Sequence, residues 1–201
     1  MKLLHTTDLH FRLHWFEWIE KQQKNFDVFC ISGDLLEPTL DTPMQEQIEW
    51  ITKWIKAFQK PLFICSGNHD IEVEGKENWL CEIDTSNYYS DNVIKTIDGI
   101  TIGCCAYIKE DDFMDFSSCD IVLNHLPPAK TTTSTDKNGN DWGDKELYSL
   151  IKSGYFSPKY ILCGHMHHPL QITDTLKNTK VYNPGVDKKK KIPNHFAIKL
   201  L

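Results

Sequence analysis

The sequence has no C-x-x-C pair, no long apolar run and no excess of positive charge. Its seven cysteines are an odd number, and most lie within apolar stretches such as VFCIS and YILCG, as small buried residues do in a reducing compartment. The missing C-x-x-C pair argues against a zinc ribbon or a thioredoxin-like site. No apolar run approaches the ~18 residues of a membrane span, and the start, MKLLHTTDLH, does not resemble a secretory signal. We therefore expect a cytoplasmic protein with no membrane association.

The charge and the length narrow the possibilities further. A formal net charge of −6 weighs against a broad grip on nucleic acid, which depends on Lys and Arg, but leaves room for a small basic patch. With 201 residues, 40% hydrophobic and 25% charged, the composition is that of an ordinary globular protein. We expect one domain over residues 1–201 and leave its oligomeric state open.

Short apolar runs rich in β-branched and aromatic residues predict strands. They cover residues 2–7, 27–32, 61–66, 100–107, 120–124, 159–163, 179–183 and 195–200. Helical spacing of apolar residues predicts helices over 14–26 and 43–58. Asp98-Gly99 predicts a hairpin turn, and 130–141 reads as one long surface loop. The alternation of strands and helices indicates an α/β fold with one mixed sheet or a pair of sheets flanked by helices.

Five of the predicted strands run into polar segments that offer metal ligands. In chain order these offer Asp8 and His10; Asp34; Asn68, His69 and Asp70; His125; and His165 with His167, whereas His168 should point away. Any one segment alone is more often a turn or a hydrogen-bonded surface group. Ligands bind beyond the carboxyl ends of strands in open α/β sheets, so five such ends at one edge favour a common site.

These segments carry a family resemblance. DLH at 8–10, GD at 33–34, GNHD at 67–70, NH at 124–125 and GHMH at 164–167 resemble, in order, the signature of the calcineurin-like metallophosphoesterase superfamily. YNPGV at 182–186 resembles an Asn-Pro-Gly segment common after the last block. The resemblance implies a four-layer α/β/β/α sandwich, in which two packed mixed β-sheets are flanked by helices.

The resemblance also implies two divalent metal ions. One would be held by Asp8, His10, Asp34 and His167, and the other by Asp34, Asn68, His125 and His165, so that Asp34 bridges them. Nitrogen and oxygen ligands without thiolate suit Mn, Fe, Zn, Co or Ni, among which we expect Mn²⁺. Two such ions with two aspartates leave a positive pocket that matches a phosphate anion.

The chemistry expected of this site is hydrolysis of a phosphate ester by a metal-bridging hydroxide. By resemblance, His69 is the general acid and Asp70 keeps it oriented and protonated, the alternative being that His69 only forms hydrogen bonds beside the ligands. Arg12 and His168 are candidates for substrate contact. His5, His14 and His195 are expected to be structural or surface residues, although His14 could reach the site.

Several functions remain in competition. The modest size and acidic charge favour a phosphodiesterase acting on a nucleotide-like or other small substrate. The alternative is a DNA nuclease similar to the nuclease subunits of double-strand-break repair complexes, in which Lys188–Lys191 would contact the phosphate backbone, although such a charge run is more often simply solvated. GDLLEP and SGNHD lack the arginines typical of protein phosphatases, and the complete ligand set disfavours an inactive binding scaffold.

Overall fold

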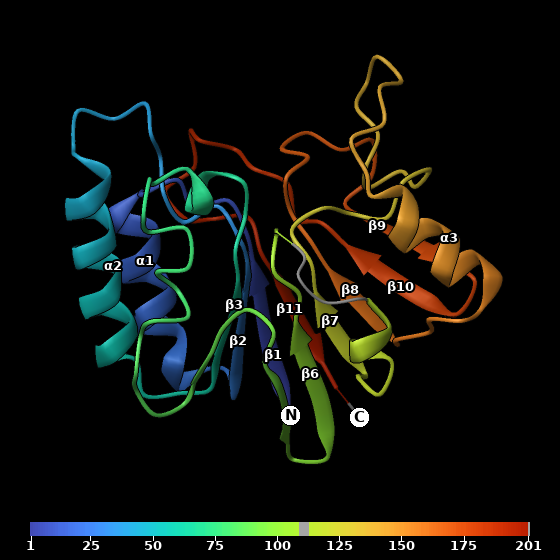
Figure 1. The fold of residues 1–201 in the computed structure, drawn as a ribbon, viewed down its shortest axis with the longest axis horizontal. Coiled ribbons are helices and arrows are strands. Elements are labelled where there is room, and N and C mark those ends of the chain that lie inside the picture. The colour runs from blue at the N-terminus through green and yellow to red at the C-terminus, as the bar shows by residue number, and fades with distance from the viewer. Residues whose placement is uncertain (109–112, 201) are drawn as a thin grey trace.

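The computed structural model describes residues 1–108 and 113–200 and arranges their strands in two sheets (Figure 1). The five-stranded sheet has the order β11-β1-β2-β3-β4, and the six-stranded sheet has the order β5-β6-β7-β8-β10-β9. The strands are β1 Lys2–Thr6, β2 Val28–Ser32, β3 Leu62–Cys65, β4 Tyr88–Tyr89, β5 Ile94–Ile97, β6 Ile100–Cys104, β7 Ile121–Leu123, β8 Tyr160–Leu162, β9 Thr173–Leu176, β10 Thr179–Tyr182 and β11 Phe196–Lys199. The α-helices are α1 Leu13–Lys21, α2 Met44–Ala57 and α3 Lys145–Ser153, and the 3-10 helices are η1 Gln22–Lys24, η2 His69–Ile71 and η3 Phe113–Phe116.

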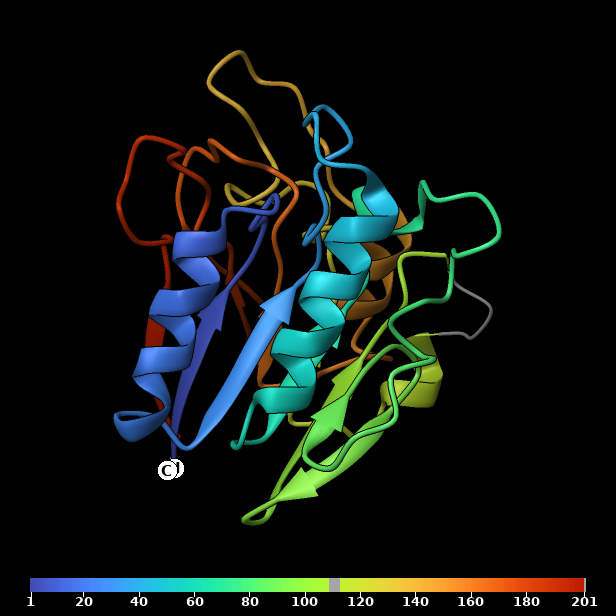
Figure 2. The ribbon, with the colours of Figure 1, turned by 90° about the vertical axis from the view of Figure 1, so that its left-hand side faces the viewer.

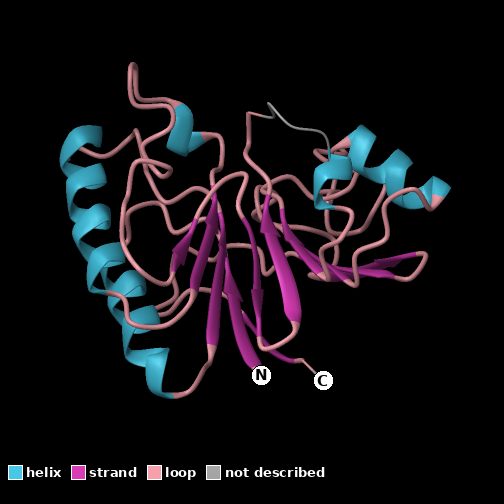
Figure 3. Cartoon of the chain, turned by 60° about the horizontal axis from the view of Figure 1, so that its bottom comes forward, coloured by secondary structure: helices cyan, strands magenta, loops and turns pink. Residues whose placement is uncertain are grey.

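Three apolar layers hold the sheets and helices together. Helices α1 and α2 cover the outer face of the five-stranded sheet (Figure 2), where Phe16 and Trp54 belong to one buried cluster with Phe29. A second cluster lies between the two sheets and includes residues of both, and a third joins α3 to the outer face of the six-stranded sheet. Helices therefore flank the strands on both sides (Figure 3), which confirms the predicted α/β/β/α sandwich.

Parallel pairing decides where the functional segments lie. Strands β1, β2 and β3 are parallel neighbours in one sheet, and β6, β7 and β8 are parallel neighbours in the other. The carboxyl ends of parallel strands share one edge of a sheet, so the polar segments after β1, β2 and β3 emerge together. The segments after β7 and β8 emerge together in the same way from the second sheet.

The predicted hairpin is confirmed, whereas the prediction of a long surface loop is partly wrong. Strands β5 and β6 pair antiparallel around Asp98 and Gly99, whose φ angles of 48° and 81° suit a tight hairpin turn. Within 130–141, by contrast, Thr131 and Thr133 are buried together with Ser134. The Thr131 hydroxyl donates to the Pro128 carbonyl oxygen at 2.8 Å, and such local bonds let polar residues be buried.

Two helical details also differ from the expectation. Helix α1 ends at Lys21 and continues to Lys24 only as the 3-10 turn η1. Helix α3 was not predicted, although Asp144 caps its start by accepting a hydrogen bond from the Leu147 N–H at 2.9 Å, and Gly154 ends it with a φ of 93°.

Within residues 1–108 and 113–200, no helix is long and apolar enough to cross a membrane.

Candidate metal centre

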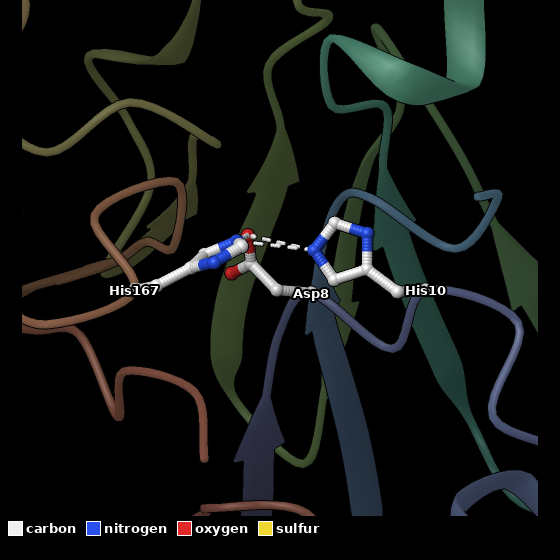
Figure 4. Close-up of side chains that lie close together, drawn as sticks. All are labelled: Asp8, His10 and His167. Carbon is white, nitrogen blue, oxygen red and sulfur yellow. Dashed lines mark hydrogen bonds and ion pairs between the residues drawn. The ribbon is translucent and has the colours of Figure 1, made fainter. Parts of the chain in front are cut away.

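Asp8, His10 and His167 form the first of two adjoining groups of ligand atoms. Figure 4 shows both imidazole rings directed toward each other beside the carboxylate of Asp8. His167 Nε2 lies 3.2 Å from Asp8 Oδ1 and 3.0 Å from His10 Nε2. Among the described residues, Asp8 Oδ1 is a buried atom without a hydrogen-bond partner. A buried carboxylate oxygen facing two imidazole nitrogens is the donor arrangement that a divalent transition metal prefers.

The second group comprises Asp34, Asn68, His125 and His165. His125 Nε2 lies 3.4 Å from Asp34 Oδ2 and 3.2 Å from Asn68 Oδ1. His165 Nδ1 lies 3.0 Å from the same Asn68 oxygen. The other ring nitrogen of His125 donates to the Ser32 carbonyl oxygen at 2.6 Å. Such a bond fixes the tautomer in which Nε2 is free to bind a metal.

Asp34 lies between the two groups. Its carboxylate belongs to one potential cation site with Asp8 and His125, and to another with His10 and His69, each with ligand atoms within 4.8 Å of one another. The structure thus brings all seven predicted ligands to one place. A carboxylate in this position can offer one oxygen to each group, which an imidazole cannot do.

The backbone at the site is strained in a way that supports a functional role. Asp8, His10, Asp34 and His165 have positive φ angles of 52°, 45°, 55° and 63°. For residues other than glycine this conformation costs on the order of 1–3 kcal/mol each and persists at functional sites where the surroundings enforce it. Here the Asp8 N–H donates to the Gly33 carbonyl oxygen at 2.9 Å, and the His10 N–H donates to that of Asp34 at 3.0 Å.

Gly33 is needed because the loops pack without space for a side chain. Its φ is +85°, and a Cβ atom there would lie 2.6 Å from His125 Nδ1 and 2.7 Å from the Gly67 nitrogen. A side chain at Gly67 would collide with Asp34 in the same way. The glycines of the GD and GNHD segments therefore let two ligand-bearing loops touch.

Burial and charge prepare the side chains for a cation. Burial lowers the pKa of His10 and of His165 to about 4, so both rings are neutral near pH 7. Burial opposes the charged form of His125 as well, but the neighbouring Asp34 raises its pKa to about 10. The same pairing keeps the pKa of Asp34 below its usual range despite burial. The donors therefore fit a metal ion, which would take the place of the proton on His125.

The Asp70 carboxylate forms its hydrogen bonds with backbone amides and not with the His69 ring, contrary to the expectation. Its oxygens accept hydrogen bonds from the backbone N–H groups of Asp34, Leu35, Leu36 and Gly67 at 2.8 to 3.1 Å. Burial and the neighbouring Asp34 raise the pKa of Asp70 to about 7, against the effect of these donors. These amides supply the hydrogen bonds that a buried carboxylate needs. Asp70 therefore fixes the two loops.

His69 lies at the edge of the site. Its side chain is 26% exposed, and its Nε2 lies 3.9 Å from Asp34 Oδ2. Its ring centroid is 5.2 Å from that of His10. The residue beside its Nδ1 is Glu72, whose Oε2 is 3.7 Å away. The structure thus places an accessible imidazole next to the ligand groups, with Glu72 in the position that was expected of Asp70.

Glu37 and Lys188 extend the site in a way that was not foreseen. Glu37 Oε2 lies 3.5 Å from His10 Nδ1 and 3.3 Å from Lys188 Nζ. Glu37 follows the GD segment by three positions, which is the only sequence signal that could have indicated it. A carboxylate behind a ligand histidine orients the ring and makes it a better donor.

Asn183, from the YNPGV segment, supports the last ligand loop. Its Nδ2 lies 2.9 Å from the Gly164 carbonyl oxygen and 3.0 Å from that of Met166. The Val186 N–H donates to the His167 carbonyl oxygen at 2.7 Å. The segment after the last block thus fixes the backbone on both sides of His165.

The remaining candidates lie around the site or away from it. His5 is buried, with its Nε2 2.8 Å from the Ser32 hydroxyl, and His195 packs on Trp18 with ring centroids 4.6 Å apart. Both are structural. Arg12 and His14 line one cleft beside the ligands, and His168 lines another.

A two-sheet sandwich with clustered Asp, Asn and His side chains at one edge defines a class of metal-dependent hydrolases. The family model of the calcineurin-like phosphoesterases matches residues 1–169. The chain therefore belongs to this family and is a phosphoric ester hydrolase whose substrates are phosphate esters.

Solved structures show the same fold at low sequence identity. The protein TT1561 of Thermus thermophilus is 14% identical with a TM-score of 0.66, over 92% of this chain and 88% of that one. A structure described as a novel archaeal phosphodiesterase is 17% identical with a TM-score of 0.52, over 98% of this chain and 100% of that one. The two-sheet architecture thus recurs in chains of similar length.

Proposed function

We propose that this chain is a dinuclear phosphodiesterase that hydrolyses a nucleotide-like or other small phosphodiester, with residues 1–201 acting as one domain. The observation that carries the proposal is the position of Asp34 between two groups of nitrogen and oxygen donors. When bound, two divalent ions would supply Lewis acidity and an activated water for attack on phosphorus. Mn²⁺ is our first candidate, with Fe, Zn, Co and Ni also compatible with these donors.

Each residue of the site would have a defined role. One ion would be held by Asp8, His10 and His167, and the other by Asn68, His125 and His165. Asp34 would bind both ions. His69 would donate a proton from Nε2 to the leaving oxygen, since that atom faces the centre and the ring is accessible. Glu72, whose Oε2 lies 3.7 Å from Nδ1, would help to orient the ring.

Phosphodiesters fit the site better than phosphomonoesters. A dianionic monoester calls for a cationic clamp beside the metals, and neither the GD nor the GNHD segment supplies an arginine. The fold shared with a protein described as an archaeal phosphodiesterase agrees with this choice. Six of the seven cysteines are buried, which supports a reducing compartment, and we propose a cytoplasmic location.

The test is turnover of bis-p-nitrophenyl phosphate against p-nitrophenyl phosphate with Mn²⁺. Faster hydrolysis of the diester supports the proposal, whereas faster hydrolysis of the monoester contradicts it. No turnover of either substrate by protein that has taken up two metal ions would favour an inactive scaffold.

A further inference from the structure

Two cavities flank the ligand groups and meet at Lys188. The first has a volume of about 710 Å³ and lies beside His167, with His168, Lys189, Ile172 and Pro184 in its wall. The second has a volume of about 470 Å³ and lies beside His10, with Arg12 and His14 in its wall. Lys188 lines both. Each cavity is in the size range of small-molecule sites.

Lys188 is held in place by a buried acid. Its Nζ lies 3.3 Å from Glu37 Oε2, while Glu37 Oε1 accepts from the Thr39 hydroxyl at 2.8 Å. An ammonium group has three donors, so contact with one carboxylate oxygen leaves others available. The Lys188 side chain is 43% exposed, which puts those donors within reach of a ligand. Lys190, in contrast, donates to Asn194 at 2.7 Å.

The Lys188 ammonium group lies on the far side of His10 from the other proposed ligands. His10 Nδ1 faces Glu37, and its Nε2 faces His167 and Asp8 on the other side of the ring. The Glu37–Lys188 pair therefore lies on the side of His10 that points away from the metal positions. A phosphate bound to the metals would be separated from Lys188 by the imidazole, so this cation suits a second anionic group.

The larger cavity combines charge with apolar surface. Ile172 is 50% exposed there, and Pro169 and Pro184 extend the apolar wall. Lys188 and Lys189 supply positive charge. Asp187 also lines the cavity, and its Oδ1 accepts a hydrogen bond from the backbone N–H of Lys189 at 3.0 Å. A nucleotide presents a flat, largely apolar base next to an anionic phosphate, and this lining matches both parts.

We propose that the cavity beside His167 binds a nucleoside arm of the substrate that carries a second phosphate, which Lys188 and Lys189 contact. This inference rests on the proposed phosphodiesterase function and names its substrate class. The class is a phosphodiester with a neighbouring phosphate, as found in a 5′-phosphorylated dinucleotide or in a single-stranded oligonucleotide.

The experiment compares three substrates with Mn²⁺: a dinucleotide, the same dinucleotide with a 5′-phosphate, and a short single-stranded oligonucleotide. The wild type should prefer the phosphorylated dinucleotide by about tenfold in kcat/KM, because hydrogen bonds between charged groups contribute that order of discrimination. Lys188→Gln and Lys189→Ala should bring this ratio toward one. Lys191→Ala is the matched control, since this exposed lysine lines neither cavity and its loss removes the same charge.

Binding to metal-free protein, measured by calorimetry, separates this inference from the proposed function. The 5′-phosphorylated dinucleotide should bind more tightly than the unphosphorylated one, and Lys188→Gln should remove the difference even if no substrate is turned over. Equal binding of both dinucleotides by the wild type, or an equal loss in Lys191→Ala, would overturn the proposal. Preference for the oligonucleotide over the phosphorylated dinucleotide would identify the strand as the source of the second phosphate, and the reverse would identify the small molecule.

Discussion

The Asp70 carboxylate accepts a hydrogen bond from the backbone N–H of Asp34 at 2.8 Å, across 36 residues of sequence. The same oxygen accepts the N–H of Gly67 at 2.9 Å. One buried side chain thus joins the loop that carries the central carboxylate to the loop that carries Asn68. The relative position of two proposed metal ligands therefore depends on a residue that is not itself a proposed ligand.

Asp70→Asn tests this function. An amide would place an NH₂ group against backbone N–H donors, so we expect a loss of about 1–3 kcal/mol in the free energy of unfolding and weaker metal binding. Urea denaturation and metal titration measure the two effects, with the exposed Asp84→Asn as control. Unchanged stability together with lower turnover on poor leaving groups would instead indicate that Asp70 acts through His69.

His69→Ala separates proton donation from metal binding. We expect the metal content to stay the same and turnover to fall by ~10²–10⁴-fold on substrates with poor leaving groups. Substrates with p-nitrophenolate as the leaving group should be affected much less, because this group needs little protonation. Loss of metal in parallel with activity would make His69 a ligand and refute its role as an acid.

Glu37→Gln tests the support of His10. The carboxylate lies 3.5 Å from His10 Nδ1, and removing its charge should lower metal affinity by about 10–100-fold. Competition with a chelator of known affinity measures this change. Glu72→Gln is the matched control, because Glu72 lies beside His69 and not beside a proposed ligand. Equal affinities of the two variants would exclude a supporting role for Glu37.

His5 predicts part of the pH dependence of stability. Burial lowers its pKa from 6.5 to about 3, so the unfolded chain binds a proton below pH 6.5 that the folded chain does not. The contribution of His5 is complete above pH 6.5 and is lost as the pH falls toward 3. His5→Gln retains a partner for Ser32 but has no titrating group. Between pH 6 and 5, its unfolding free energy should therefore fall less steeply than that of the wild type, by about 1.4 kcal/mol per pH unit. Both proteins should be treated with a chelator so that no bound metal contributes. Equal pH dependence of the unfolding free energy in the wild type and His5→Gln would contradict this prediction.

The proximity of the seven proposed ligands could be predicted because it depends on strand direction. Apolar runs locate the strands, and parallel strands bring their carboxyl ends to one edge. The hydrogen bonds of Asp70 could not be predicted in the same way. Whether its carboxylate meets a histidine ring or a backbone amide depends on the distance between two loops, which the sequence pattern does not contain.

The same reason explains the other omissions. The Glu37–Lys188 pair joins residues 151 positions apart, and a run of four lysines gives no sign that one of them faces a buried acid. The sequence suggests that Thr131 and Thr133 are surface residues. They are buried because their hydroxyls bond to each other and the Thr131 hydroxyl also bonds to the backbone. Helix α3 is short and buries only two apolar side chains, Leu147 and Ile151, so its helical pattern is weak. Tertiary partners decide each of these features.

The most direct test of the central claim is the number of metal ions bound per chain by wild type and by Asp34→Asn. Metal-free protein would be titrated with Mn²⁺, and electron paramagnetic resonance would show whether the bound ions are magnetically coupled. If Asp34 joins two sites, the wild type will bind two coupled ions, and Asp34→Asn will bind fewer and show no coupling. A single ion in the wild type, or two coupled ions in Asp34→Asn, would contradict the account.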